Sequence, residues 1–419
     1  MPRKDLSSSF TWTHDVSNSQ ALGASAYLSH ARQSTLMGSE WPVASPPYDD
    51  RKLAVIGAGT MGAGIAQCAI SAGFQTQLFD INQAALDRGM QKIQRSLENA
   101  VNKGKLSIQE QAQRLAKLSS HTNWRDLQNC DVVIEAVFEN LSIKQQVMAQ
   151  LHQTCPEHTL LISNTSTLDI DAMASASRRP DQVLGMHFLT PAHITPLVEV
   201  IKGKATSDTS ISRAHQLATR LGKLPILTGN AWGFIGNRMF EGYLREVDAL
   251  QLEGVSADRI DKALEAFGFA LGPCKTLDMA GTDLVSQVLT ARGLQFEQPP
   301  EYRRITQRLA ELGRLGHKTQ RGHYIYKNNT ATIDPDLQQV CAQEAERFGI
   351  AQQPNVTDKD IVQRCVQPLM DEGHLLLQQG LAQRASDIDL IWVLGYGFPA
   401  KRGGPMYMSG ESSVLHQLT

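Results

Sequence analysis

Three glycines at fixed spacing constrain the fold of this 419-residue chain more than any other feature. In the stretch LAVIGAGTMGAGIAQ, Gly57, Gly59 and Gly62 follow a short apolar run and open a segment with helical periodicity. A G-x-G-x-x-G turn between a strand and a helix is typical of dinucleotide-binding α/β domains. The first glycine permits the tight turn, the second lets the backbone approach a pyrophosphate, and the third lets helix and strand pack closely.

An acidic residue, Asp80, ends the next predicted strand. A carboxylate at this place accepts hydrogen bonds from the adenosine ribose hydroxyls and repels a 2′-phosphate. The alternative is a glycine turn that binds no ligand. Such a turn would not need a preceding strand, a following helix and an acidic residue after the next strand, so their joint presence argues against it. The sequence therefore predicts an NAD site built from Gly57, Gly59, Gly62 and Asp80.

Short apolar runs alternate with longer amphipathic segments from Lys52 to Gly229. This alternation predicts a parallel α/β sheet with crossover helices. A polar excursion from Gln83 to about Leu118 indicates a helical hairpin, and helical patterns dominate after Gly229. The predicted strands are Leu53–Ile56, Thr76–Phe79, Val132–Glu135, Leu160–Ile162, Val183–His187, Leu197–Ile201 and Leu224–Leu227.

The helical part contains an internal repeat. The segment that begins at Asn237 resembles the one that begins at Gln363, in a register fixed by the pairs Arg238/Arg364, Gly254/Gly380 and Asp261/Asp389. Amphipathic helices also resemble one another by chance. We expect an N-terminal tail and linker helix at 1–50, a Rossmann NAD-binding domain at 51–229, a first helical domain at 230–327 and a second, truncated one at 355–419.

Composition argues against several classes of protein. A formal net charge of −2 gives no global attraction to nucleic acid or an anionic membrane, and no apolar run is long enough to span a bilayer. The six cysteines are far apart, so we expect reduced core thiols and no metal site. The chain starts without an apolar targeting segment and ends His-Gln-Leu-Thr rather than in a peroxisomal tripeptide, which favours the cytoplasm.

The segment GMHFLTPAHITPLVEVIKG supplies a candidate acid–base pair. His187 ends one predicted strand and Glu199 lies on the next, so both can reach the edge where open α/β sheets bind their ligands. A carboxylate that orients an imidazole helps it remove a hydroxyl proton while hydride leaves the same carbon. Taken alone, a histidine and a glutamate at this spacing are more often structural.

Six motifs in chain order resemble the 3-hydroxyacyl-CoA dehydrogenase family, from about Leu53 to Met408. They are VIGAGTMGAGIA, EAVFENLSIK, SNTSTL, HFLTP…LVEVIKG, GFIGNRM and GFALGP. The resemblance implies NAD-dependent, reversible oxidation of (S)-3-hydroxyacyl-CoA to 3-ketoacyl-CoA, as in fatty-acid β-oxidation. It also implies that His187 is the general base and Glu199 its carboxylate partner, with Ser166 and Asn237 holding the substrate's 3-oxygen and positioning the histidine.

The same resemblance implies further binding residues. Ala136, Glu139 and Lys144 correspond to cofactor-binding positions, and Ser96 and Lys103 to places where the family meets coenzyme A. A lysine beside anionic phosphates gains a charge-assisted hydrogen bond. A solvated helix face would carry the same residue types as Ser96 and Lys103.

The doubled helical unit narrows the resemblance to the dehydrogenase half of peroxisomal-type bifunctional enzymes, in which an enoyl-CoA hydratase domain precedes the Rossmann domain. No such domain fits in the roughly fifty residues before the glycine turn. We therefore expect this chain to correspond to the dehydrogenase half without the hydratase domain. A separate enoyl-CoA hydratase and a second copy of the chain are the candidate partners.

Three departures from the family pattern are visible. Thr190 stands where the family usually has Asn or Ser, and Gln363 stands in the second copy where the first has Asn237. The second copy lacks a counterpart of the stretch from about 282 to 326. A shortened unit should expose apolar surface, so we expect another subunit, a partner or the N-terminal linker helix to cover it.

Two alternative functions stay open. The same chemistry could act on an acyl-carrier-protein thioester or a short hydroxy acid in a specialised pathway. The chain could also be a non-catalytic subunit that binds NAD or acyl-CoA in a β-oxidation assembly. The presence of His187, Glu199, Ser166 and Asn237 together speaks against this second alternative.

Overall fold

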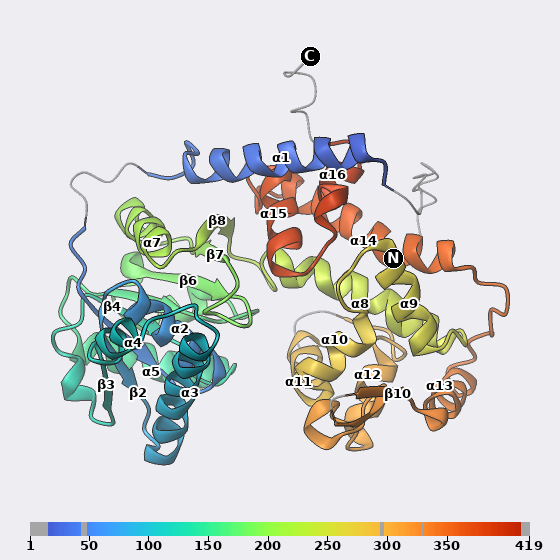
Figure 1. Cartoon of the computed structure of the whole chain (residues 1–419), viewed down its shortest axis with the longest axis horizontal. Helices are drawn as coiled ribbons and strands as arrows, with labels where there is room; N and C mark the ends of the chain where they lie inside the picture. Colours follow the sequence, from blue (N-terminus) through green and yellow to red (C-terminus); the bar gives the residue numbers. More distant parts are fainter. Residues whose placement is uncertain (1–15, 43–47, 294–296, 329, 412–419) are drawn as a thin grey trace. The chain divides into compact units, whose positions relative to one another are not determined.

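The computed structural model describes residues 16–42, 48–293, 297–328 and 330–411 (Figure 1). Most of the predicted N-terminal tail and the C-terminal tetrapeptide lie outside these ranges. The chain divides into two compact units. We call them the sheet unit, which holds Ser29–Asn237 and Leu376–Gly395, and the helical unit, which holds Arg238–Leu375 and the described residues before 29 and after 395.

The sheet unit is built on an eight-stranded sheet in the order β3-β2-β1-β4-β5-β6-β7-β8. All the predicted strands are present, and β3 is an additional strand at one edge. β3 is mostly polar and contains no buried residue, so it gives no apolar run in the sequence. The strands are β1 (Lys52–Ile56), β2 (Gln75–Phe79), β3 (Leu118–His121), β4 (Val132–Glu135), β5 (Leu160–Ser163), β6 (Val183–Phe188), β7 (Leu197–Lys202) and β8 (Leu224–Gly229).

The prediction of a parallel sheet is wrong for one pair of strands. β6 and β7 are antiparallel, whereas the other neighbours in the sheet are parallel. Only residues 189–196 connect β6 to β7. A parallel crossover needs a dozen or more residues, so this short connection dictates the antiparallel pairing. The register places His187 directly opposite Glu199.

Helices cover both faces of the sheet. Successive residues of a strand point to opposite faces, so neighbouring residues belong to different cores. Val55 belongs to an apolar core with α2, α3 and α7, and Ala54 belongs to a second core with α5 and α6. The predicted helical hairpin is α3 and α4. The helices and turns of this unit are α2 (Thr60–Ser71), α3 (Gln83–Asn102), α4 (Ile108–Leu115), η1 (Trp124–Leu127), α5 (Leu141–Thr154), α6 (Ile170–Ala174), η2 (Pro180–Gln182), α7 (Asp208–Arg220) and α15 (Ala385–Gly395).

The helical unit contains one small hairpin, β9 (Tyr324–Lys327) with β10 (Thr330–Ile333), that the sequence analysis missed. Elsewhere in the helical unit, the fully buried Arg303 guanidinium pairs with Glu241 at 3.0 Å and with Asp248 at 3.4 Å. The helices and turns that lie wholly or mostly in this unit are α8 (Gly236–Leu252), α9 (Ala257–Phe267), α10 (Pro273–Ala280), α11 (Thr282–Gly293), α12 (Arg304–Glu311), η3 (His317–Thr319), α13 (Pro335–Arg347), α14 (Asp358–Gln378), η4 (Ala400–Arg402) and α16 (Pro405–Met408).

Contacts between α8 and α14 are reciprocal. Arg238 on α8 pairs with Glu372 on α14, and Arg364 on α14 pairs with Glu246 on α8 at 3.2 Å. In the register that aligns Arg238 with Arg364, Glu246 aligns with Glu372. Equivalent residues of the two helices therefore make the same contact twice, in opposite directions.

The predicted linker helix is present as α1, which spans Asn18–Leu36. Within the helical unit the Tyr27 ring lies 4.7 Å from that of Tyr407 on α16. Within the sheet unit the Thr35 hydroxyl donates to Asp387 at 2.8 Å, and Arg384 donates to the Ser34 carbonyl at 3.0 Å. Each half of α1 is thus packed within its own unit.

All six cysteines are buried thiols, and none forms a disulfide in the described chain. Across those same residues, no helix combines the length and apolarity needed to cross a membrane.

Candidate active site

His187 and Glu199 form a buried pair at the end of β6. The His187 Nδ1 lies 2.7 Å from the Glu199 Oε2. The other carboxylate oxygen of Glu199 accepts hydrogen bonds from the backbone N–H groups of Ile235, at 3.1 Å, and Gly236, at 3.0 Å. Because both oxygens are held, the carboxylate fixes the imidazole ring. With Nδ1–H donating to Glu199, Nε2 is the nitrogen left to accept a proton.

The loop after β5 carries Ser166 and is tied to the histidine strand. The Asn164 side-chain oxygen accepts a hydrogen bond from the Phe188 N–H at 3.0 Å, next to His187. The Asn237 side-chain amide donates to the Ser166 carbonyl at 3.1 Å. The structure thus links Ser166 to both Asn237 and the strand of His187. Sequence reasoning missed Asn164, although it lies inside the SNTSTL motif.

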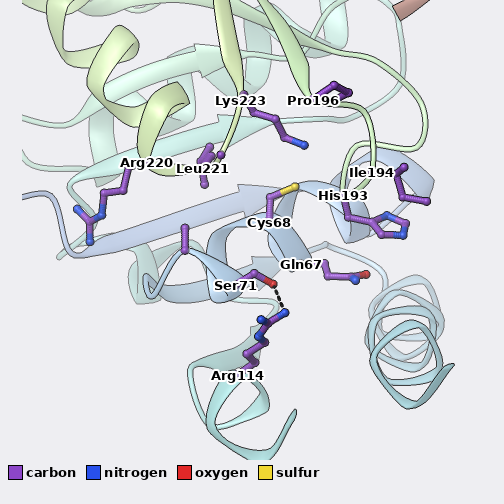
Figure 2. A pocket seen from close by; sticks show the side chains of 12 residues that line it. Gln67, Cys68, Ser71, Arg114, His193, Ile194, Pro196, Arg220, Leu221 and Lys223 are labelled. Atoms are coloured by element: carbon purple, nitrogen blue, oxygen red, sulfur yellow. Dashed lines mark hydrogen bonds between the residues drawn. The ribbon is translucent and has the colours of Figure 1, made fainter. Parts of the chain in front are cut away.

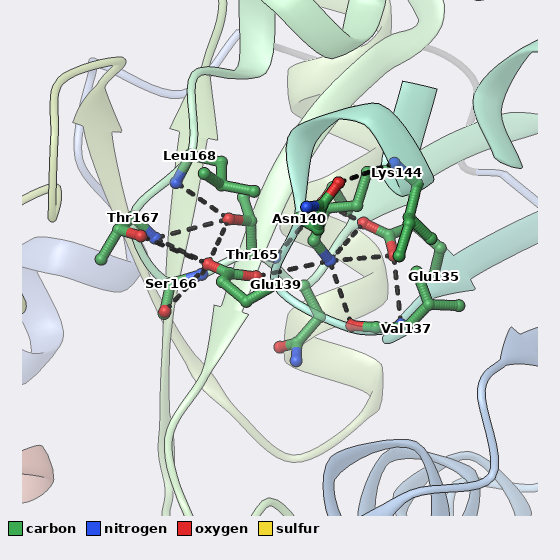
Figure 3. A network of polar contacts seen from close by, with 12 residues as sticks. Glu135, Val137, Glu139, Asn140, Lys144, Thr165, Ser166, Thr167 and Leu168 are labelled. Atoms are coloured by element: carbon green, nitrogen blue, oxygen red, sulfur yellow. Dashed lines mark hydrogen bonds and ion pairs between the residues drawn. The ribbon is translucent and has the colours of Figure 1, made fainter. Parts of the chain in front are cut away.

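The loop that carries Ser166 donates several hydrogen bonds to one carboxylate oxygen of Glu139 (Figure 3). Its Oε1 accepts hydrogen bonds from the Thr165 hydroxyl at 2.7 Å, the Ser166 N–H at 2.7 Å and the Thr167 N–H at 3.1 Å. Burial raises the pKa of Glu139, but the Lys144 ammonium and the loop donors outweigh burial and leave that pKa lowered. Since the folded-state pKa is lowered, the stabilising contribution of Glu139 is present above its unfolded pKa and is lost as the pH falls.

Lys144 supports this arrangement from inside the sheet unit. Its side chain is fully buried, and its ammonium donates to the two oxygens of the buried Glu135 carboxylate at 2.9 and 3.0 Å. The Glu139 Oε2 lies 3.5 Å away. In this network Lys144 acts on the Ser166 loop through Glu139, and its predicted contact with the cofactor stays a prediction.

Replacing Lys144 with methionine should lower the free energy of unfolding by about 3–5 kcal/mol, because the Glu135 carboxylate would stay buried without its cation. Urea denaturation followed by circular dichroism measures the change. The matched control is Lys105→Met, at an exposed lysine, which should change stability by less than about 0.5 kcal/mol. Equal, small effects of both substitutions would show that the buried pair contributes little.

The three glycines of the turn differ in the space around their α-carbons. Gly57 has a φ of +98°, and a Cβ there would lie 2.7 Å from the Ala136 carbonyl oxygen. A Cβ at Gly62 would overlap the Gly57 carbonyl oxygen. A Cβ at Gly59 would meet no atom within 4 Å, so the open space is on the side from which a ligand can approach the backbone.

The glycine turn and its surroundings fit NAD. Asp80 accepts hydrogen bonds from the Ala58 N–H and the Asn82 N–H, both at 2.9 Å, which places its carboxylate against the turn. No side chain caps the N-terminus of α2 at Gly59. The first N–H groups of a helix lack partners within the helix and attract phosphate. The backbone of Ala136 lines the turn beside Gly57, and its predicted contact with the cofactor stays a prediction.

The predicted coenzyme A residues lie on the helical hairpin. Ser96 is partly buried on α3, and Lys103 follows α3 with an exposed side chain. Within the described residues, no carboxylate forms an ion pair with Lys103. Contact of Ser96 and Lys103 with coenzyme A stays a prediction.

Comparison with known proteins decides the family. Residues 52–231 match the NAD-binding domain of 3-hydroxyacyl-CoA dehydrogenase, and residues 233–326 match the C-terminal domain of the same enzyme. The chain belongs to the 3-hydroxyacyl-CoA dehydrogenase family. The predicted resemblance and the predicted NAD-binding domain are thereby confirmed.

Relatives of this dehydrogenase family cover most of the chain. The chain is 38% identical over 398 residues to a peroxisomal bifunctional enzyme of Danio rerio, and the match covers 91% of this chain and 54% of that protein. It is 34% identical over 361 residues to a fatty acid oxidation complex subunit alpha of Pseudomonas putida, covering 86% of this chain and 50% of that protein. The chain therefore spans about half the length of these relatives.

Solved structures of the 3-hydroxyacyl-CoA dehydrogenase family agree with the fold. A 3-hydroxybutyryl-CoA dehydrogenase from Escherichia coli is 28% identical with a TM-score of 0.72, covering 88% of this chain and 98% of that one. The dehydrogenase part of multifunctional enzyme 1 from C. elegans is 28% identical with a TM-score of 0.62, covering 93% and 91%. The predicted Rossmann domain followed by a family-type helical domain is confirmed at this level.

Proposed function

We propose that this chain catalyses the NAD-dependent, reversible oxidation of (S)-3-hydroxyacyl-CoA to 3-ketoacyl-CoA. The observation that carries the proposal is the buried His187–Glu199 pair, with its 2.7 Å contact and its doubly anchored carboxylate. Membership of the 3-hydroxyacyl-CoA dehydrogenase family supports the same reaction.

The roles of the side chains follow from their positions. NAD supplies the hydride acceptor when bound at the glycine turn. His187 Nε2 removes the proton of the 3-hydroxyl group, and Glu199 stabilises the imidazolium that forms. Ser166 and Asn237 hold the 3-oxygen in this proposal, and the Glu139–Lys144 network keeps the Ser166 loop in place. In the reverse direction the imidazolium returns the proton to the oxygen.

The second helical domain is, in this proposal, a truncated copy of the first. The reciprocal pairs of α8 and α14, Arg238 with Glu372 and Arg364 with Glu246, support it. Two copies related by a local two-fold axis make each such contact twice, as a symmetric dimer interface does. The Phe269 and Phe398 rings, which end the two repeats, also touch at 5.5 Å between centroids.

The shortened end of the second copy is covered, at least in part, by the N-terminal helix. Tyr27 of α1 packs on Tyr407, and Thr35 of α1 bonds to Asp387. A separate enoyl-CoA hydratase stays a candidate partner, since two relatives are named as a bifunctional enzyme and as a subunit of a fatty acid oxidation complex. A cytoplasmic location stays a prediction, because some relatives are named as peroxisomal.

The direct test is NADH oxidation, followed by absorbance, with 3-ketoacyl-CoA substrates of graded chain length. We expect turnover with at least one coenzyme A thioester and at least about tenfold lower kcat/KM for the same acyl group on acyl carrier protein, because Lys103 attracts the coenzyme A phosphates in this proposal. Preference for the carrier protein or for a free hydroxy acid would favour the first alternative. NADH binding without turnover on any thioester would favour the non-catalytic alternative.

A further inference from the structure

A second candidate binding site lies in the sheet unit, away from the glycine turn. A cavity of about 390 Å³ is lined by Gln67, Cys68, Arg114, His193, Arg220 and Lys223, among others, and we call it the basic hollow (Figure 2). Its lining comes from α2, α4, the connection between β6 and β7, the last residue of α7, and the residues between α7 and β8. None of its 12 lining residues is acidic.

Lys223 is the strongest indication that this hollow receives an anion. Only 6% of the residue is exposed, and its ammonium donates to the carbonyl oxygens of Ala192 at 2.6 Å and Thr195 at 2.7 Å. In the described ranges no carboxylate forms an ion pair with it. Burial raises the pKa of the neighbouring Cys68 thiol, so the thiol stays neutral and supplies no balancing charge. A buried charge without a counter-ion is costly, and a bound anion would neutralise it.

Two guanidinium groups add charge at the other side of the hollow. Arg114 donates to the Ser71 hydroxyl at 3.1 Å, and Arg220 stacks on the Phe74 ring at 3.8 Å and donates to the Asp50 carbonyl. A guanidinium has five N–H donors, so each retains donors for a phosphate.

Nearby negative groups do not balance these cations. The C-terminus of α2 lies at Ser71 and carries only about half an elementary charge. Asp49 is largely exposed and pairs with Arg51. Glu110 lies near Arg114, but its carboxylate is exposed and accepts hydrogen bonds from Ser107, so it offsets at most one of the three cations. The hollow therefore keeps a net positive charge.

We infer that the basic hollow binds the phosphate groups of a small molecule, with room for two linked phosphates. The hollow contains the C-terminal part of α2, whereas the glycine turn precedes its N-terminus. A helix of this length spans about 18 Å, so the two sites are separate. The inference does not depend on the proposed dehydrogenase activity, since none of the residues proposed for that activity lines the hollow.

The test is calorimetric titration of NADH-saturated protein with inorganic pyrophosphate, since NADH fills the glycine turn. We expect saturable binding that is about tenfold or more weaker in the double variant Arg114→Gln/Arg220→Gln, because each substitution removes a charge-assisted bond. The control, Arg95→Gln/Lys105→Gln, removes the same charge from exposed residues of the helical hairpin and should leave binding unchanged. Circular dichroism checks that each variant is folded, and Arg220→Gln alone serves if the double variant is not.

An NMR titration of His193 reports on the site directly. Burial and the Lys223 charge lower the pKa of His193. A bound anion favours the protonated ring, so pyrophosphate should raise this pKa in the wild type and not in the double variant. A parallel titration with ADP tests whether the hollow prefers a nucleotide. If it does, ADP should bind more tightly than pyrophosphate; if the hollow recognises only the phosphates, the affinities for ADP and pyrophosphate should be similar.

Three results would overturn the inference. Binding could be absent once NADH fills the glycine turn, which would assign the pyrophosphate to that turn. Binding could weaken equally in the control variant, which would assign it to general charge. The pKa of His193 could stay unchanged at saturating pyrophosphate, which would place the anion elsewhere.

Discussion

Replacing His187 with alanine should lower kcat by about 10²–10⁴-fold, the usual contribution of a general base, while leaving NADH affinity nearly unchanged. The two effects should separate because His187 lies at the end of β6, whereas the proposed pyrophosphate site is the turn after β1. The fold should survive, since the ring is held by one side-chain bond to Glu199. Steady-state kinetics with a 3-ketoacyl-CoA and calorimetric titration with NADH measure the two effects.

A histidine far from the pair provides the control. His158 has a side chain that is 64% exposed, and His158→Ala should leave both kcat and NADH affinity unchanged. A kcat near that of the wild type in His187→Ala would remove this residue from the mechanism. Equal losses in both variants would point to instability rather than to chemistry.

Alanine at Gly59 and alanine at Gly62 should affect the protein in different ways. A Cβ at Gly59 meets open space, so Gly59→Ala should change the free energy of unfolding by less than about 0.5 kcal/mol. The same methyl group occupies the space in which a pyrophosphate approaches the backbone, so NADH should bind at least about tenfold more weakly, which is about 1.4 kcal/mol.

Gly62→Ala should lower both the free energy of unfolding and the affinity for NADH. Its Cβ would overlap the Gly57 carbonyl oxygen, so the turn must move, at a cost of about 1–3 kcal/mol in stability and with a loss of NADH binding. Urea denaturation and calorimetric titration of the two variants side by side provide the measurement. A Gly59→Ala variant that binds NADH as tightly as the wild type would show that the dinucleotide does not follow the turn as inferred.

Much of the sheet unit could be predicted because its signals are local. The strands that carry the site are continuous apolar runs, and the glycine turn has a fixed spacing, so β1, α2 and Asp80 were recognisable from residue types alone. The strand direction of β7 was not recognised. The short connection after β6 contained that information, because it is too short for a parallel crossover.

The supporting network around Ser166 could not be predicted in the same way. Family resemblance predicts that Glu139 and Lys144 contact the cofactor, but it does not indicate that they also contact each other, Glu135 and the Ser166 loop. Which buried carboxylate faces which buried ammonium depends on the packing of β4 against α5, and sequence spacing does not reveal it. Asn164 was missed for the same reason, since its partner, Phe188, is on another strand.

In the proposed reaction His187, fixed by Glu199, moves a proton at the substrate's 3-oxygen while hydride moves at C3. The most direct measurement supplies NADH labelled with deuterium at the transferable C4 position, together with a 3-ketoacyl-CoA, and locates the label in the product by mass spectrometry. We expect deuterium at C3 of the 3-hydroxyacyl-CoA with the wild type, formed at a rate lower by about two orders of magnitude or more with His187→Ala. A wild-type product without deuterium at C3, or equal rates of labelling by the two proteins, would contradict the proposed reaction.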